Sequence, residues 1–254
     1  MVYLENPPVY EALADEFAWE KTYSAEKKRR QQVEPVLSKI SGVVKWMRRN
    51  LKKPRLIRTA AFHIGELRNL LQLQGSFHMV DVGCGGGEKT AQIPEFLASR
   101  GLPMVSPIGV EVSPVLARAS AERFAPFGGR CVESTAIEGV EQLDNDSIHL
   151  VILSSFLEHE VNPVGLLDAC RRKLVTGGRI IIKVPNYGSL NRKVRQQKWC
   201  GFRYPDHVNY FTPQTLEATI RKAGLSARPK GWLDTMPTSD NMWSIAEKSD
   251  PAGF

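Results

Sequence analysis

The sequence predicts an α/β protein with a doubly wound, mainly parallel sheet of seven strands and a helical appendage at the N-terminus. Three observations support this fold class. From residue 57 onward, short apolar segments alternate with segments of helical periodicity, which is typical of parallel crossover units. A glycine-rich turn joins the first apolar segment to the next helical one. Residues 1–56 lack this alternation and are strongly basic.

Residues 1–56 are expected to form a basic helical appendage. Apolar residues recur at helical spacing within Val9–Tyr23 and Pro35–Leu51. Residues 21–60 hold 13 Lys and Arg against two acids, whereas the rest of the chain is net acidic. This charge is either a solvated helical face or a surface for nucleic acid, an anionic membrane or an acidic substrate.

Residues 57–254 carry the alternating elements and are expected to form the second domain. Strands are bounded by turn residues, and helices carry start or stop signals such as Pro at the first position or Gly after the last. The expected strands are Phe77–Val82, Ile108–Val112, Arg130–Glu133, Ile148–Leu153, Arg179–Val184, Ser226–Trp232 and Met242–Ala246. The expected helices are Leu56–Leu73, Glu88–Ser99, Pro114–Phe124, Pro163–Val175 and Pro213–Ala223. In such sheets ligands bind at the carboxyl ends of the strands.

The composition is that of an ordinary globular protein, with 42% hydrophobic and 24% charged residues. No apolar run approaches the roughly 20 residues of a membrane-spanning helix, and the N-terminus lacks the pattern of a secretory signal. The four cysteines show no metal-ligand spacing. We therefore expect free thiols, a cytoplasmic location and no metal site.

The turn from Asp81 to Gly87 contains four glycines within five residues. Glycine suits a loop that needs unusual backbone angles and close approach to a ligand, and the following helix N-terminus offers unpaired N–H groups. A dinucleotide-binding loop would require glycine where Glu88 stands, and Glu88 also interrupts the ending of a P-loop. The turn therefore predicts a different ligand.

Asp81, Gly83, Gly85 and Gly87 form the pattern acid-x-Gly-x-Gly-x-Gly, which resembles motif I of class I S-adenosylmethionine-dependent methyltransferases. The resemblance implies a Rossmann-like sheet and S-adenosylmethionine (SAM) as cofactor. It also implies that the turn, including Cys84, meets the zwitterionic amino acid end of the cofactor, with Asp81 helping to position it.

Further positions resemble cofactor contacts of this family. Glu111 stands 30 residues after Asp81 at the end of the second strand, where the family uses an acid to hold the ribose hydroxyls. A carboxylate that accepts two O–H bonds is a suitable partner for them. The resemblance extends the expected cofactor-binding set to Val112, Thr135, Ala136, Ser154 and Ser155.

The acceptor side resembles the small-molecule branch related to ubiquinone-type O-methyltransferases. Leu157-Glu158-His159 follows the fourth strand, and Pro205-Asp206-His207 lies within the aromatic segment from Trp199 to Thr212. Residues 186–212 form a long excursion between a strand and a helix, and such segments are often lids. We therefore expect an acceptor-side lid at residues 186–212.

Methyl transfer from a sulfonium is an in-line displacement, so the protein mainly supplies alignment and electrostatics. A hydroxyl acceptor must also lose its proton, which calls for a general base. His207 and His159 are the candidate catalytic residues, because imidazole accepts a proton near neutral pH. An orienting or packing role for either histidine stays open.

The expected function is O-methylation of a small acceptor, with negatively charged, lipid-linked and sugar-linked molecules as options. One alternative is an RNA methyltransferase that uses the basic N-terminal segment, since the basic and aromatic residues of the lid also suit stacked bases; nucleic acid is the less favoured partner. Another alternative is a non-catalytic scaffold that binds the cofactor. The sequence does not indicate an oligomeric state.

Overall fold

The computed structural model describes residues 2–5, 54–73, 75–102, 104–228, 231 and 234–249. The helices predicted within Val9–Tyr23 and Pro35–Leu51 lie outside these residues. The division into residues 1–56 and 57–254 therefore stays a prediction. Within the described ranges, no helix combines the length and hydrophobicity that a membrane span requires.

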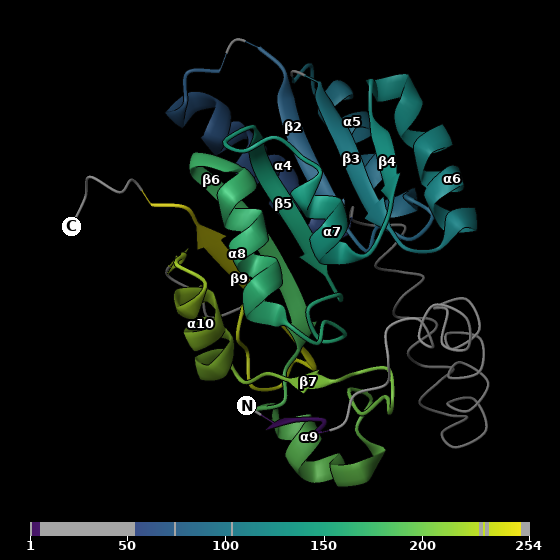
Figure 1. Cartoon of the computed structure of the whole chain (residues 1–254). Helices are drawn as coiled ribbons and strands as arrows, with labels where there is room; N and C mark the ends of the chain where they lie inside the picture. The colour runs from purple at the N-terminus through teal and green to yellow at the C-terminus, as the bar shows by residue number, and fades with distance from the viewer. Residues whose placement is uncertain are drawn as a thin grey trace.

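Seven strands form one sheet in the order β4-β3-β2-β5-β6-β9-β8 (Figure 1). Neighbouring strands from β4 to β6 pair in parallel, whereas β9 is antiparallel to both β6 and β8. The strands are β2 (Phe77–Val82), β3 (Val105–Glu111), β4 (Arg130–Glu133), β5 (Ile148–Ser154), β6 (Leu174–Pro185), β8 (Ser226–Ala227) and β9 (Asn241–Glu247). The predicted seven-stranded, mainly parallel sheet is confirmed.

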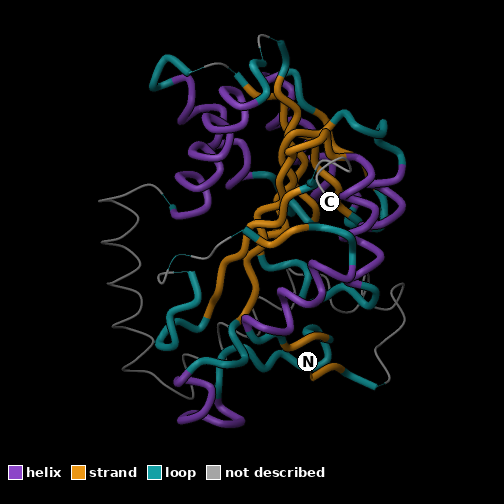
Figure 2. Tube along the Cα trace, turned by 90° about the vertical axis from the view of Figure 1, so that its left-hand side faces the viewer, coloured by secondary structure: helices purple, strands orange, loops and turns teal. Residues whose placement is uncertain are grey.

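Helices cover both faces of the sheet, and Figure 2 shows the strands between two helical layers. One layer consists of α4 (Arg55–Leu70), α5 (Glu88–Ala98) and α6 (Pro114–Phe124), and the other of α7 (Ala136–Glu141), α8 (Pro163–Lys173) and α10 (Pro213–Lys222). Helices α6, α8 and α10 each begin with Pro, after the capping side chains of Ser113, Asn162 and Thr212. These caps satisfy backbone N–H groups that the first helical turn leaves unpaired.

Alternation along β5 divides the core into two parts. Val151 and Leu153 pack in the cluster that includes α8 and α10, whereas Leu150 and Ile152 pack in the cluster that includes α4 and α5. All four side chains are at most 2% exposed. A strand covered on both faces reads as a continuous apolar run, which is why the sequence predicts this strand so clearly.

Some element boundaries differ from the prediction. Helix α8 ends at Lys173 rather than Val175, because β6 already begins at Leu174 and runs through Gly177. The predicted strand Ser226–Trp232 is reduced to β8, with Arg228 following it as coil and Trp232 outside the described residues. Pairing with neighbouring strands determines where these elements begin and end, and the local sequence pattern does not indicate that pairing.

Several short elements have no signal in the sequence. Helices α7 and α9 (Leu190–Arg195) contain six residues each, too few to show a helical period. β1 (Val2–Tyr3) pairs antiparallel with β7 (Asn209–Tyr210), which lies about two hundred residues away in the chain. Single 3-10 turns occupy Ala125–Phe127 and Gln196–Lys198. The second, two-stranded sheet fixes one end of the predicted lid.

Arg179 on β6 is 3% exposed and carries a buried charge network. It donates to Glu66 at 2.6 Å, to Glu247 at 3.1 Å and to Nδ1 of His63 at 2.9 Å. We expect Arg179→Ala to lower the free energy of unfolding by about 3 kcal/mol, because it removes a buried guanidinium that binds two acids and a histidine, and leaves Glu66 and Glu247 only their longer contacts with Arg228. Urea unfolding measures this change. Arg221→Ala, which breaks an exposed pair, is the control and should cost about 0.5 kcal/mol or less; equal losses in the two variants would contradict the prediction.

Candidate active site

The glycine-rich turn between β2 and α5 has the backbone geometry that its sequence predicts. Gly83, Gly85 and Gly87 have positive φ angles of 67°, 57° and 78°. A Cβ at Gly83 would lie 2.1 Å from the ring of Phe156, and a Cβ at Gly87 would lie 2.9 Å from Ser120 Oγ. Positions 83 and 87 therefore require glycine for both conformation and space.

Glu111 ends β3 and binds the backbone of the turn. Its Oε2 accepts a hydrogen bond from the N–H of Gly85 at 2.9 Å, and its Oε1 accepts one from the N–H of Ser113 at 3.0 Å. Each carboxylate oxygen has a second lone pair, so the group can still accept hydroxyls of a ligand. The two bonds hold the carboxylate where the neighbouring parallel strands β2 and β3 end together.

A small hollow opens at these strand ends. It is lined by Gly83, Val110, Glu111, Val112, Ser134, Ala136 and Phe156. Gly83, Glu111, Val112 and Ala136 belong to the predicted cofactor-binding set. Phe156 is a lining residue that sequence reasoning missed. The parallel pairing of β2 with β5 brings it over the turn, and no local motif reports that pairing.

Three other predicted cofactor-binding residues, Thr135, Ser154 and Ser155, do not line the hollow. Thr135 Oγ1 donates to Glu138 at 2.8 Å at the start of α7. Ser155 has a positive φ of 62°, and its Oγ accepts a hydrogen bond from Lys183 Nζ at 2.8 Å. Ser154 is the last residue of β5. The roles of these residues stay predictions.

Asp81 lies beneath the turn and is 6% exposed. Its Oδ2 accepts a hydrogen bond from Thr90 Oγ1 on α5. Burial raises the pKa of Asp81 to about 7, although the Thr90 hydrogen bond and the charge of Lys89 oppose the shift. The carboxyl group thus titrates near neutral pH in the free protein.

The raised pKa of Asp81 predicts a pH-dependent stability. Between its ordinary value of 3.8 and about 7, the folded state binds more protons than the unfolded state, so stability falls as the pH rises through this window. We expect Asp81→Asn without cofactor to gain on the order of 2 kcal/mol over the wild type at pH 8 and much less at pH 5. Urea unfolding at the two pH values measures the difference. The exposed Asp144→Asn is the control, and parallel pH curves for wild type and Asp81→Asn would contradict the prediction.

A polar cluster follows β5 on the acceptor side of the sheet. His159 Nδ1 lies 2.8 Å from the backbone oxygen of Asp206 and 3.2 Å from its Oδ1. The rings of His159 and His207 are 4.7 Å apart, edge to face. Glu158 is 1% exposed, and its Oε2 has no hydrogen-bond partner. The fold thus brings both predicted catalytic histidines together, although 47 residues separate His159 from Asp206.

A family model described as "Methyltransferase domain" matches residues 45–229. The chain belongs to this methyltransferase family. The class I SAM-dependent methyltransferase predicted from motif I is confirmed, and SAM is its cofactor. The chain is therefore an enzyme, which removes the scaffold alternative.

Curated relatives named ubiquinone biosynthesis O-methyltransferase resemble this methyltransferase. The relative from Cereibacter sphaeroides is 27% identical over 192 residues, which covers 70% of this chain and 71% of the relative. The relative from Idiomarina loihiensis is 30% identical over 138 residues and covers 54% and 51%. A solved SAM-dependent methyltransferase from Archaeoglobus fulgidus has a TM-score of 0.51 at 20% identity and covers 76% of this chain and 94% of that one. This structural likeness supports the fold.

The two histidines of the methyltransferase titrate differently. Burial alone would lower the pKa of His159, but the hydrogen bond from its ring to Asp206 and the charges of Glu158 and Asp206 outweigh it, so the pKa is raised. Burial lowers the pKa of His207 to about 3, and the charges of His159 and Arg203 add to the effect. His207 therefore stays neutral at physiological pH, whereas His159 takes up a proton more readily than an ordinary histidine.

Glu158, His159 and His207 also form the one group of metal-ligand type found among the described residues. One ligand atom from each lies within 4.8 Å of the others. Each Nδ1 already meets a backbone oxygen, that of Asp206 for His159 and that of Gly201 for His207, so Nε2 is the atom each ring could offer. The sequence shows no such ligand spacing, because the residues come from two distant segments. The absence of a metal site stays a prediction.

The predicted lid, residues 186–212, contains α9 and β7 and an aromatic cluster. Trp199 packs edge-to-face on Phe202 at 5.4 Å and is 1% exposed, and Tyr187 lies 5.9 Å from Tyr210. Two of its basic side chains are engaged within the protein, since Arg203 pairs with Asp206 at 2.8 Å and Arg192 lies over the Tyr187 ring at 4.1 Å. Much of the aromatic and basic character of this segment therefore serves its own packing.

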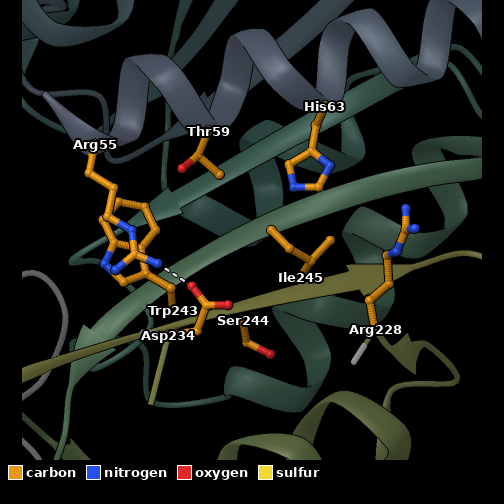
Figure 3. Close-up of a pocket in the computed structure, with 8 residues that line it drawn as sticks. All are labelled: Arg55, Thr59, His63, Arg228, Asp234, Trp243, Ser244 and Ile245. Atoms are coloured by element: carbon orange, nitrogen blue, oxygen red, sulfur yellow. Dashed lines mark hydrogen bonds and ion pairs between the residues drawn. The ribbon is translucent and has the colours of Figure 1, made fainter. Parts of the chain in front are cut away.

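A second hollow lies between α4 and β9. It is lined by Arg55, Thr59, His63, Arg228, Asp234, Trp243, Ser244 and Ile245 (Figure 3). Arg55 pairs with Asp234 and lies 5.0 Å from the centre of the Trp243 ring, and Arg228 pairs with Glu247 at 3.3 Å. Its charges are balanced by neighbours, and it contains none of the predicted site residues.

Proposed function

We propose that this methyltransferase methylates a hydroxyl oxygen of a small-molecule acceptor. The observation that carries the proposal is the His159–Asp206 pair at the carboxyl end of β5. The backbone N–H of His159 donates to the backbone oxygen of Phe156 at 2.8 Å, and Phe156 lines the hollow at the glycine-rich turn. This turn keeps the backbone of His159 close to that of a residue that lines the hollow, which supports a base near the cofactor.

The geometry of the pair supports His159 as the general base. A carbonyl oxygen only accepts hydrogen bonds, so its 2.8 Å contact with Nδ1 places the ring proton on Nδ1. Nε2 then carries the free lone pair and can take the proton of the acceptor hydroxyl. The Asp206 carboxylate, 3.2 Å from Nδ1, stabilises the imidazolium that forms. His207 is a positioning residue, because it is buried, neutral and packed against the His159 ring.

The cofactor-binding residues have matching roles in this proposal. SAM supplies an activated methyl group when it is bound. Glu111 accepts hydrogen bonds from the ribose hydroxyls of the cofactor. The backbone of the turn from Gly83 to Gly87 and the Asp81 side chain contact the amino acid end of the cofactor. Val112, Thr135 and Ala136 lie around the adenine of the cofactor, and Ser154 and Ser155 complete the cofactor-binding set at the carboxyl end of β5.

The names of the relatives support an oxygen acceptor and a small molecule. Lys183 supports an acceptor that carries negative charge, because it is half-buried on β6 and its Nζ donates to Ser155 Oγ at 2.8 Å, within the predicted cofactor-binding set. RNA is less favoured, because Trp199 is buried and Tyr187, Phe202 and Tyr210 pack around it and on one another, which leaves Tyr204 as the exposed aromatic of the lid. A cytoplasmic location is part of the proposal.

Methyl transfer from labelled SAM tests the proposal directly. We would offer a panel of phenols with and without a carboxylate, a polyprenyl phenol and total RNA, and would follow the label. The expected result is label in an ether of a phenol, with the carboxylated members preferred. Label in RNA, or on carbon or nitrogen of a small molecule, would contradict the proposal.

A further inference from the structure

Cys84 and Cys131 meet beside the cofactor turn although 47 residues separate them in the chain. Cys84 lies in the turn after β2, and Cys131 lies in β4. Their Sγ atoms are 3.9 Å apart. Strand β3 runs between β2 and β4, and its Gly109 pairs with both Asp81 and Cys131.

Gly109 is what leaves room for the two sulfurs. A Cβ at this position would lie 2.7 Å from Cys84 Sγ and 2.9 Å from Cys131 Sγ. Any other residue would push the thiols apart. The sheet therefore holds the two thiols next to each other above Gly109.

Both cysteine residues are only partly buried. Cys84 and Cys131 are half-buried, in contrast to Cys170, which is fully buried. A hydrogen bond with Cys84 lowers the pKa of Cys131 and raises that of Cys84, so Cys131 is the better nucleophile. None of the four cysteines forms a disulfide in this structure.

Formation of a disulfide between Cys84 and Cys131 would displace the glycine-rich turn. A disulfide requires an S–S distance of about 2.05 Å, so the two sulfurs must approach by nearly 2 Å. Cys131 is held within β4, whereas Cys84 belongs to the turn. Ser120 Oγ contacts Cys84 Sγ at 3.3 Å and donates to the backbone oxygen of Gly85 at 2.6 Å. Displacing Cys84 therefore disturbs Gly85, whose N–H binds Glu111.

We propose that Cys84 and Cys131 are an oxidative modification site, at which a peroxide forms a disulfide that ties the turn to β4 and weakens SAM binding. The effect on SAM rests on the proposed role of this turn, whereas the cross-link rests on the sulfur geometry alone.

The reaction balances with hydrogen peroxide as the oxidant. The Cys131 thiolate attacks one peroxide oxygen, the O–O bond breaks, and a sulfenic acid forms with release of one water after protonation. Cys84 sulfur then attacks the Cys131 sulfur, the S–OH bond breaks, and a second water leaves. The two thiols together lose two electrons and two protons, which the peroxide takes up.

The test treats the full chain with hydrogen peroxide and maps the disulfides by non-reducing peptide mass spectrometry. SAM affinity is measured by calorimetry before treatment, after it, and after reduction with dithiothreitol. We expect a Cys84–Cys131 peptide and a Kd for SAM that rises about tenfold, as for one lost hydrogen bond to a charged group, and that recovers on reduction. Cys131→Ser should bind SAM normally and lose the peroxide effect, whereas Cys200→Ser should keep it.

Two results would overturn the proposal. The first is the absence of the Cys84–Cys131 peptide when peroxide has already oxidised other thiols. The second is a complete cross-link with an unchanged Kd for SAM. Failure of the reduced wild type to bind SAM at all would instead overturn the cofactor role of the turn and the affinity effect with it, while the peptide map would still decide the cross-link.

Discussion

Replacement of His159 by alanine should lower kcat for methyl transfer about 100- to 10,000-fold, the usual contribution of a positioned general base. Nε2 of His159 is the lone pair that takes the acceptor proton, so its loss leaves the hydroxyl to be deprotonated by water. KM for SAM should change little, because His159 does not line the cofactor hollow. Initial rates of methyl transfer, measured with an acceptor that the wild-type enzyme methylates, give both kcat and KM for SAM.

The pH dependence separates a catalytic His159 from a structural one. The base must be unprotonated, so the rate should rise with pH through the His159 pKa, which is raised above its ordinary 6.5, and then level off. Asp206→Asn removes the charge that supports the imidazolium and should move the inflection to lower pH. His207→Asn should leave it in place, because His207 is already neutral. His78→Ala, at the other end of β2, is the control. An unshifted inflection in Asp206→Asn, or a His159→Ala enzyme within threefold of wild type, would show that His159 is not the base.

Replacement of Glu111 by alanine should raise the Kd for SAM about 100-fold. The carboxylate fixes the turn through the N–H of Gly85 and offers its remaining lone pairs to the ribose hydroxyls. Hydrogen bonds to a charged group contribute about 1.5–3 kcal/mol each, and about 3 kcal/mol corresponds to this factor. Calorimetry with SAM measures the change directly.

A matched control for this variant lies on the neighbouring strand. Glu133 pairs with Glu111 across β3 and β4 but is exposed and does not line the hollow. Glu133→Ala should therefore bind SAM as the wild type does. Thermal unfolding should show that Glu111→Ala is folded at the temperature of the titration. Equal SAM affinities of Glu111→Ala and Glu133→Ala would show that Glu111 does not bind the cofactor.

Local patterns predicted the framework of the fold closely. The strand Phe77–Val82 and the helix Pro114–Phe124 agree residue for residue, because a buried apolar run and a Ser-Pro start are properties of adjacent residues. Elements whose ends depend on a partner were less well predicted. β6 begins at Leu174 because it pairs with β5 there, and β1 exists only through its pairing with β7.

The cofactor turn shows what the sequence determined by itself. Its acid and glycines lie within seven residues and need particular backbone angles and space, so their resemblance to motif I, together with Glu111, indicated the methyl donor. The alternation of apolar and helical segments predicted the fold class. The positive φ angles of Gly83, Gly85 and Gly87 agree with that inference.

Only the tertiary structure decided which side chains act together. Asp206 supports His159, Phe156 covers Gly83, and Cys84 faces Cys131, each across a long stretch of chain. The two histidines read alike in the sequence, yet burial leaves His207 neutral while Asp206 makes His159 basic. Contacts of this kind depend on strand order and on exclusion of water, which a single local pattern does not encode.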